Sequence, residues 1–340
     1  MKKSCEPSID TISFLYLLPW KVAFQRSPVW PIEKSNPVFF ILPMFTIGAA
    51  AYDGAFRNAK SVLTVVDAPE YVGMDESPAL ALRRKPRASV KVAAELVAAG
   101  DAAALFSAGH TGATVMAAHG AFGMLPGLDR PALAATLPAK DSAVVLLDSG
   151  ASVECRPAHL VQFALMGAAF SRTALGVAEP RVGLLSIGGE ANKGNDLTRE
   201  AHRLLQSVPV RFVGNVEAGD LYSGGADVVV CDGFTGNIAL KVSEGLVETV
   251  EGMLREELAE TLGTRLGWLL SRRAFRNFRR RVDYAEHGGA PLLGVAGITI
   301  VGHGRSSAKA VRSAILMAAR LAEAGFIEKL KDDAGARQAS

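Results

Sequence analysis

The chain has 340 residues, enough for one large domain or two ordinary ones with a substantial core. Hydrophobic residues make up 49% of it, charged residues 21%, and 34 residues are glycine, which excludes a disordered or fibrous protein and favours a loop-rich α/β enzyme. The net charge of +3 is too small for a globally basic nucleic-acid binder, so we expect no nucleic-acid partner. The three cysteines, Cys5, Cys155 and Cys231, form no C-x-x-C motif, which argues against a disulfide framework and for a cytoplasmic location.

Residues 1–60 differ in composition from the rest of the chain. They hold 10 of the 23 aromatic residues and 6 of the 16 prolines. Their longest apolar stretch is broken by Pro43 and is shorter than the roughly 20 residues that a membrane span needs. We therefore expect no anchor or cleaved signal there. The chain divides into an atypical N-terminal segment (1–60), one domain (61–330) and a tail (331–340).

From about residue 62 two patterns alternate. Short apolar, β-branched runs end in glycine-rich turns, and a stretch with helical periodicity follows each turn. The expected strands are 103–106, 143–147, 181–187, 210–213, 226–231 and 298–301, and the expected helices include 89–99, 159–175, 197–206 and 235–262. This alternation predicts a mostly parallel sheet with helices on both faces.

The loops that follow the expected strands are rich in glycine and small polar residues. In sheets of this kind, ligands bind beyond the carboxyl ends of the strands. A glycine-rich turn that opens a helix leaves backbone N–H groups free at the positive end of the helix dipole, which suits an anion such as phosphate. Six such loops occur, at 107–113, 148–151, 186–196, 214–217, 232–237 and 302–307. Their number predicts an anion-binding protein.

Several well-known motifs are missing from the sequence. It contains no G-x-x-x-x-G-K-[ST] phosphate loop, no G-x-G-x-x-G after a first strand and no G-x-S-x-G nucleophile elbow. These absences disfavour a P-loop nucleotide hydrolase, an ordinary dinucleotide-binding enzyme and a lipase-like triad. Because His110, His159 and His303 are scattered along the chain, we expect neither a metal site nor a cofactor.

From about Leu63 to Ala324 the sequence resembles the bacterial phosphate acyltransferases of the PlsX family. The order and spacing of the matching blocks hold over roughly three quarters of the chain. The blocks are Ser107–Ala113, Arg130–Ala132, Leu147–Ala151, Gln162–Gly167, Pro180–Asp196, Gly214–Glu217, Val228–Asn237, Gly288–Gly294, His303-Gly304 and Ala308–Ala310.

The resemblance implies both a fold and an activity. The fold is a Rossmann-like αβα sandwich related to phosphotransacetylases and isopropylmalate dehydrogenases, assembled as a homodimer. The activity is transfer of a fatty acyl group from acyl carrier protein to inorganic phosphate, giving acyl phosphate for phospholipid (phosphatidic acid) synthesis. We weigh two alternatives, namely a phosphotransacetylase that uses acyl-CoA and an inactive, membrane-associated binding module.

Phosphate attack on a thioester requires groups that hold an anion and stabilise an oxyanion. We expect Lys193, Asn237 and His303 to be catalytic: Lys193 as a cation for phosphate or oxyanion, Asn237 as an amide donor, and His303 as a base or a donor. Each also has a plain structural interpretation, as a solvated lysine, a helix cap or a loop histidine. The expected substrate and phosphate ligands are Ser107, Gly109, His110, Thr111, Gly112, Asn195, Asn215, Asp232, Thr235 and Gly236.

A covalent route through sulfur is a further possibility for acyl transfer. The sequence shows no evident histidine partner for Cys155 or Cys231. Because buried free cysteines are common, direct attack by phosphate is favoured over an acyl-cysteine intermediate.

An arginine-rich segment, 255–282, has the pattern of a basic amphipathic helix. Such a helix suits the surface of an anionic membrane or the acidic acyl carrier protein, and its plain alternative is a helix that packs in a dimer. In the resembled family the corresponding region is associated with peripheral membrane contact, which also makes the glycerol-3-phosphate acyltransferase a candidate partner. The expected contact residues are Arg265, Trp268, Leu269, Arg272, Arg273, Phe275 and Arg276.

Residues 1–60 depart from the resembled family. Its members open with a strand that leads into an Asp-Ala-Met-Gly-Gly-Asp motif, and Asp53-Gly54 is the nearest approach to that motif here. Our hypothesis is a shifted reading frame or an altered terminus. An intact mass of natively expressed protein that contains residues 1–60 as written would contradict it. As written, the segment leaves out a strand expected beside the active site.

Overall fold

The computed structural model describes residues 38–41, 66–140, 142–282, 288–304 and 306–335. Nine strands in these residues form one sheet in the order β1-β2-β9-β8-β3-β4-β7-β5-β6. The strands are β1 (Val38–Ile41), β2 (Ala104–Ser107), β3 (Ala132–Pro138), β4 (Ala143–Leu147), β5 (Arg181–Leu185), β6 (Arg211–Val216), β7 (Val228–Val230), β8 (Ala290–Leu293) and β9 (Ile298–Val301). All six expected strands are present, as β2, β4, β5, β6, β7 and β9.

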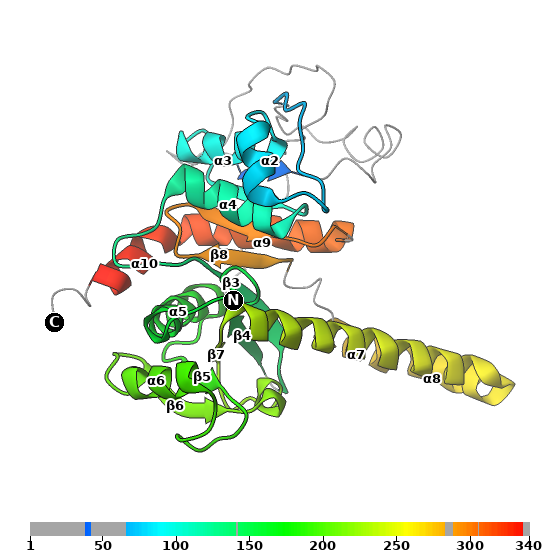
Figure 1. The fold of residues 1–340 in the computed structure, drawn as a ribbon. Coiled ribbons are helices and arrows are strands. Elements are labelled where there is room, and N and C mark those ends of the chain that lie inside the picture. Colours follow the sequence, from blue (N-terminus) through cyan, green and yellow to red (C-terminus); the bar gives the residue numbers. More distant parts are fainter. Residues whose placement is uncertain (1–37, 42–65, 141, 283–287, 305, 336–340) are drawn as a thin grey trace, which may run out of the picture.

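Helices cover both faces of this sheet (Figure 1). They are α2 (Pro78–Arg84), α3 (Ser89–Ala98), α4 (Thr111–Phe122), α5 (Pro157–Phe170) continued by the π-helix η2 (Ser171–Leu175), α6 (Asp196–Leu205), the 3-10 helix η3 (Ala218–Leu221), α7 (Gly233–Glu260), α8 (Leu262–Val282), α9 (Ala308–Glu323) and α10 (Phe326–Gly335). The largest buried cluster joins α5, α6, α9 and α10 to one face. Three smaller clusters place α3, α4 and α7 on the other. This is the expected αβα sandwich, and its sheet is mostly parallel.

The side chains of a single strand alternate between the two faces of the sheet, which explains why a layer of helices packs on each face. On β2, Phe106 joins the large cluster beneath α9, whereas its neighbour Leu105 packs with α3 and α4 on the opposite face. On β7, Val228 and Val230 share the large cluster, whereas Val229 lies on the face covered by α7. Successive side chains of a strand point to opposite faces, so buried strands are apolar throughout.

The strands do not all run in one direction, so the loops that follow them do not all lie at the same edge of the sheet. β2 and β9 are parallel, but β9 pairs antiparallel with β8, β8 antiparallel with β3, and β3 antiparallel with β4. β4, β7, β5 and β6 are parallel to one another. The carboxyl ends of β2 and β9 therefore lie at one edge of the sheet, and those of β4 to β7 at the opposite edge.

Helix α7 begins where β4 and β7 end, runs across the sheet toward the ends of β2 and β9, and then leaves the body of the molecule. Its first turns cover the sheet through Leu240 and Ser243, and none of its later residues is buried. Beyond Ser243 it projects with α8 as a helical arm (Figure 1). The arm contains most of the expected amphipathic segment 255–282.

The ends of the chain lie largely outside the described residues. Within 1–60 the structure describes only β1, which pairs in parallel with β2. The sequence as written therefore does supply a strand beside β2, which corrects our expectation that residues 1–60 leave out a strand beside the active site. At the other end, α10 continues to Gly335, past residue 330. Within the part of the chain that the structure describes, no helix has both the length and the apolarity needed to cross a bilayer.

Candidate active site

Six of the expected site residues gather where β2 and β9 end. We call this set, which consists of Ser107, Gly109, His110, Thr111, Gly112 and His303, the β2/β9 site. The N–H of Gly302 donates to the carbonyl of Ser107 at 2.8 Å, which ties the two loops together. His110 caps α4, and its Nδ1 accepts from the N–H of Ala113 at 3.4 Å. Thr111 and Gly112 form the first turn of α4, where helix N–H groups are free of intrahelical partners.

The β2/β9 site lies at a topological switch point. β2 and β9 are parallel neighbours, yet α4, after β2, packs on one face and α9, after β9, on the other. The two helices therefore begin at the same sheet edge on opposite faces of the sheet, the arrangement at which sheets of this kind usually bind ligands. Ser307 caps α9 through the N–H of Ala310. Two helix N-termini at one edge favour an anion.

Glu244, on α7, is a site residue that the sequence analysis missed. Its Oε1 lies 3.3 Å from Nε2 of His303, and its Oε2 accepts from Nζ of Lys241 at 2.8 Å. Burial acts to raise the pKa of Glu244, but the hydrogen bonds from His303 and Lys241 outweigh burial and lower that pKa to about 2. Glu244 is thus ionised at neutral pH and holds the His303 imidazole. The two residues are 59 positions apart, so no local motif could reveal the pair.

A second group forms where β4 and β7 end, around the buried carboxylate of Asp148. Its Oδ1 accepts from the N–H groups of Leu133, Gly150 and Ala151 at 2.8, 3.0 and 2.9 Å, and its Oδ2 from that of Ser152 at 2.6 Å. Burial raises the pKa of Asp148 to about 6, against the effect of these four donors. Asp148 therefore organises the loop between β4 and α5.

The first turn of α7 fits closely against that loop. A Cβ at Gly233 would lie 2.7 Å from Oδ2 of Asp148, and one at Gly236 would clash with the Asp148 carbonyl oxygen, so both positions require glycine. Asp232 caps α7 by accepting from the N–H of Thr235 at 2.9 Å and from its hydroxyl at 2.7 Å. The amide of the exposed Asn237 lies beside Gly150. Asp148, Gly150, Asp232, Thr235, Gly236 and Asn237 make up what we call the β4/β7 site.

The third group is the loop 186–196 after β5, which we call the Lys193 loop. Lys193 is exposed, and its ammonium has no partner among the described residues. The hydroxyl of Ser186 at the start of the loop is buried and likewise unpartnered there. Asn195 caps α6 through the N–H of Thr198 at 2.9 Å. Asn215, from β6, donates its amide to the carbonyl of Glu190 in this loop at 2.7 Å.

The three expected catalytic residues fall into three different groups. His303 belongs to the β2/β9 site, Asn237 to the β4/β7 site and Lys193 to its own loop. Among the described residues, the His303–Glu244 pair connects the β2/β9 site to α7. From Asn237 to Glu244 the helix rises by about 10 Å, at 1.5 Å per residue. Asn237, in the first turns of α7, and His303, which contacts α7 at Glu244, therefore lie apart from each other.

The expected membrane or carrier-protein contacts lie on α8. Arg265, Trp268, Leu269, Arg272 and Arg273 are exposed, and the Arg272 guanidinium sits 5.9 Å from the centre of the Trp268 ring. Phe275 is half-buried, and the side chain of Arg276 lies outside the described residues. Leu270 adds an apolar side chain that is 79% exposed.

Both described cysteines are poor nucleophiles. Burial and the nearby Asp148 carboxylate raise the pKa of Cys155 to about 12, and burial raises that of Cys231 well above its ordinary value. Neither thiol ionises at neutral pH, which leaves the acyl-cysteine alternative without support. Among the described residues, no group of three or more His, Cys, Asp and Glu is placed to hold a metal ion.

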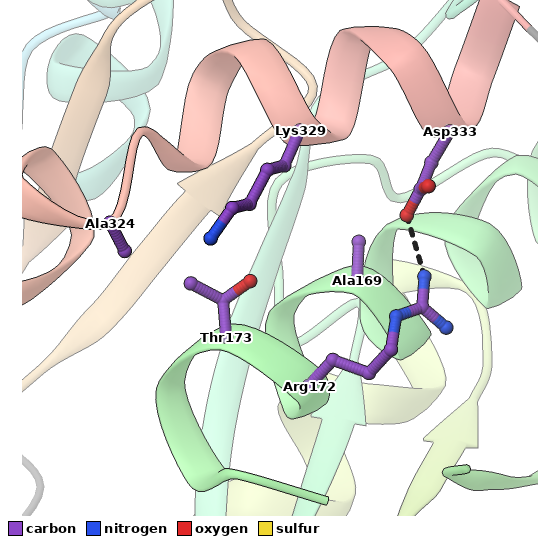
Figure 2. Close-up of a pocket in the computed structure, with 6 residues that line it drawn as sticks. All are labelled: Ala169, Arg172, Thr173, Ala324, Lys329 and Asp333. Atoms are coloured by element: carbon purple, nitrogen blue, oxygen red, sulfur yellow. Dashed lines mark hydrogen bonds and ion pairs between the residues drawn. The ribbon is translucent and has the colours of Figure 1, made fainter. Parts of the chain in front are cut away.

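A hollow of about 330 Å³ lies away from all three groups, between η2 and α10 (Figure 2). Lys329 points toward Thr173 there, and Arg172 pairs with Asp333 at 2.5 Å. Ala169 and Ala324 complete its lining. None of the expected site residues lines this hollow, so it does not compete with the strand-end loops as the candidate site.

Comparison with known proteins adds independent evidence. A family model described as "Fatty acid synthesis protein" matches residues 53–329. A phosphate acyltransferase from Desulforudis audaxviator is 52% identical over 263 residues, which cover 77% of this chain and 78% of the relative. One from Acidobacterium capsulatum is 48% identical over 279 residues, 82% of this chain and 83% of the relative. A solved phosphotransacetylase from Streptococcus pyogenes shares the fold, with a TM-score of 0.52 at 18% identity over 86% of each chain.

The α/β fold, the loops suited to anions and the relatives described above together define an acyltransferase. The chain belongs to the phosphate acyltransferase family, and its sequence motifs had predicted that membership. Its substrates therefore include phosphate and an acyl donor.

Proposed function

We propose that this protein moves a fatty acyl group from acyl carrier protein to inorganic phosphate. A phosphate oxygen attacks the thioester carbonyl, a C–O bond forms and the C–S bond breaks. The products are acyl phosphate and the free thiol of the carrier, and the acyl phosphate enters phospholipid (phosphatidic acid) synthesis. Direct attack is chosen over a cysteine intermediate because both described thiols stay protonated at neutral pH.

One observation carries most of this proposal, namely the pairing of two helix N-termini with His303 at the β2/β9 switch point. The N-terminal N–H groups of α4 suit the phosphate oxygens. His303 is 63% exposed and so remains accessible to a ligand. With Glu244 on Nε2, its Nδ1 is the nitrogen left to accept a proton from dihydrogen phosphate or to hydrogen-bond the nucleophile. The leaving thiolate takes up the proton released.

Lys193 and Asn237 keep their proposed roles as anion and oxyanion contacts. The Lys193 ammonium and the exposed Asn237 amide both have no hydrogen-bond partner among the described residues, which fits groups kept for a ligand. Asp232, Thr235, Gly236 and Asn195 support them chiefly through helix capping and close packing. Because Asn237 lies apart from His303, we propose that Asn237 contacts the acyl-thioester end of the substrate.

We propose that the arm formed by α7 and α8 serves the carrier protein and the membrane. The exposed arginines of α8 suit the acidic surface of acyl carrier protein and the headgroups of anionic lipids. Trp268, Leu269 and Leu270 supply apolar area for shallow insertion. This arrangement fits a cytoplasmic enzyme that touches the membrane peripherally and passes its product to a glycerol-3-phosphate acyltransferase.

We propose a homodimer, supported by a stripe of exposed apolar residues on α7. They recur every three to four positions along one face of the helix, which is unusual for a solvated surface. The members are Phe234, Ile238, Val242, Leu246, Val250 and Met253. We also propose that residues 61–330 form the phosphate acyltransferase domain, to which β1 adds an edge strand and which α10 extends to Gly335.

The test is phosphate-dependent loss of thioester from acyl carrier protein, run beside acyl-CoA, with Lys193→Ala and with an exposed lysine variant, Lys140→Ala, as the control. We expect acyl phosphate from the parent and the control, and a strong loss in Lys193→Ala. A faster reaction with acyl-CoA would favour the phosphotransacetylase alternative instead. No turnover by folded protein that still binds anionic vesicles would favour the inactive binding module.

A further inference from the structure

A buried chain of hydrogen bonds runs from α6 through β6 into the Lys193 loop. His202, on α6, is 8% exposed and Asn215, on β6, is 9% exposed. Nδ1 of His202 lies 2.8 Å from Oδ1 of Asn215, and Nδ2 of Asn215 donates to the Glu190 carbonyl at 2.7 Å. The proposed reaction uses neither His202 nor this series of hydrogen bonds.

The chemistry of the partners sets the direction of each hydrogen bond. An amide oxygen only accepts, so Nδ1 of His202 carries the proton and donates to Asn215. Nε2 of His202 is then free to accept from the Gln206 amide, which lies at 3.4 Å. The ring packs edge-on against Phe212, with centroids 5.1 Å apart. Both ends of the Asn215 amide are therefore engaged inside the protein.

The chain of bonds ends at the turn that carries Lys193. The Glu190 carbonyl, which receives the Asn215 amide, also receives the N–H of Lys193 at 3.0 Å. Just beyond, Gly194 has φ +98°, and a Cβ there would clash with Thr198 Oγ1. The backbone of the turn is thus held on both sides, while the Lys193 ammonium stays without a partner among the described residues.

We propose that Asn215 and His202 are positioning residues that hold the Lys193 turn in place for the substrate anion. Asn215 thereby acts through the loop and not as a phosphate ligand, which revises its expected role. The inference rests on the proposed role of Lys193. Pre-organising a cationic loop matters because a shift of about 1 Å in a binding group lowers activity by as much as 10²-fold.

A double-mutant cycle tests this assignment. Asn215→Ala is expected to lower kcat/KM for phosphate by roughly 10- to 100-fold. In Lys193→Ala the same change is expected to cost no more than about twofold, because the loop then has no ammonium to position. If the losses in kcat/KM from the two single changes multiply in the double variant, the proposal is overturned and Asn215 is a direct ligand. Ser207→Ala, which removes only a bond to Leu204 at the end of α6, is the matched control.

A second readout does not depend on activity. Amide hydrogen exchange of residues 190–193 is expected to speed up in Asn215→Ala and His202→Ala. His202→Asn should restore slow exchange, because an asparagine amide can place a donor near the position of Nδ1. Unchanged exchange in both alanine variants would contradict the proposal. If Lys193→Ala keeps full activity while exchange responds as expected, the catalytic role of Lys193 fails but the positioning role stands.

Discussion

The carboxylate of Glu244 joins the His303 imidazole to α7, at the point where this helix leaves the body of the molecule. A carboxylate on one nitrogen of an imidazole fixes which nitrogen faces the substrate. Glu244→Gln keeps the shape but removes the charge, and we expect kcat to fall by roughly tenfold, with His303→Ala falling further. In the double variant the loss should equal that of His303→Ala alone. Steady-state kinetics with saturating donor would check this, and independent losses would show that Glu244 does not act through His303.

The lowered pKa of Glu244 also predicts a pH dependence of stability. The folded value is about 2 and the ordinary value is 4.5, so ionised Glu244 stabilises the fold above pH 4.5. This stabilisation is lost as the pH falls from 4.5 toward 2. Unfolding free energies from denaturant titration should therefore drop less steeply in Glu244→Gln than in the parent over that range. An equal pH dependence of the unfolding free energy in both proteins would contradict the contacts of Glu244 with His303 and Lys241.

Asp148 predicts a dependence of the opposite sign. Its folded pKa is about 6 and its ordinary pKa is 3.8, so the folded state binds the proton more tightly. The resulting stabilisation of the folded state is greatest below pH 3.8 and is lost as the pH rises through 6. The unfolding free energy falls over this range by at most about 3 kcal/mol. Relative to Asp148→Asn, the parent should lose stability between pH 4 and 6. A constant difference in unfolding free energy between the two proteins from pH 4 to 6 would contradict the raised pKa of Asp148.

At the level of elements, the start of α7 depends on close backbone contact with the loop after β4. Gly236→Ala places a methyl group against the Asp148 carbonyl, so we expect a loss of about 1–3 kcal/mol or more in unfolding free energy. Gly245→Ala, in the same helix, meets no atom within 4 Å and should stabilise the protein by about 0.5–1 kcal/mol. Denaturant unfolding of both variants provides the comparison. Equal effects would mean that α7 is not seated as described.

The helical arm predicts binding to anionic membranes. Replacing Arg272 and Arg273 by alanine should weaken binding to anionic vesicles by about 1 kcal/mol per arginine. Arg199→Ala, on α6, removes an exposed arginine of the body and serves as the control. Vesicle flotation at low and physiological salt would measure both. Equal binding by the parent and the double variant would remove the arm from the membrane proposal.

Elements differed in how well the sequence predicted them, for local reasons. Ala143–Leu147 and Ile298–Val301 are rich in β-branched residues, which favour strands wherever they lie. β3 and β8 consist of alanine, leucine, proline and one threonine, and they are strands because their neighbours pair with them. Missing these two strands concealed the reversal of sheet direction. The glycine-rich turns were therefore predicted correctly, but their division between two opposite edges of the sheet was not.

The candidate site shows the same limit at the scale of the whole molecule. Motifs identified His110 and His303 separately, and the pairing of β2 with β9 brings their loops together. Glu244 could not be predicted, because only the packing of α7 across the sheet carries it to His303. Buried hydrogen bonds, and not sequence spacing, distinguish Asn215 from the exposed Asn237.

The most direct measurement follows phosphate oxygen into the product. Acyl-[acyl carrier protein] is incubated with the enzyme and phosphate that is fully labelled with heavy oxygen, and the acyl product is analysed by mass spectrometry. Attack by phosphate predicts acyl phosphate that retains every labelled oxygen, with formation that depends on phosphate and falls strongly in His303→Ala. Free fatty acid without label, formed at the same rate in the absence of phosphate, would show attack by water and contradict phosphate acyl transfer.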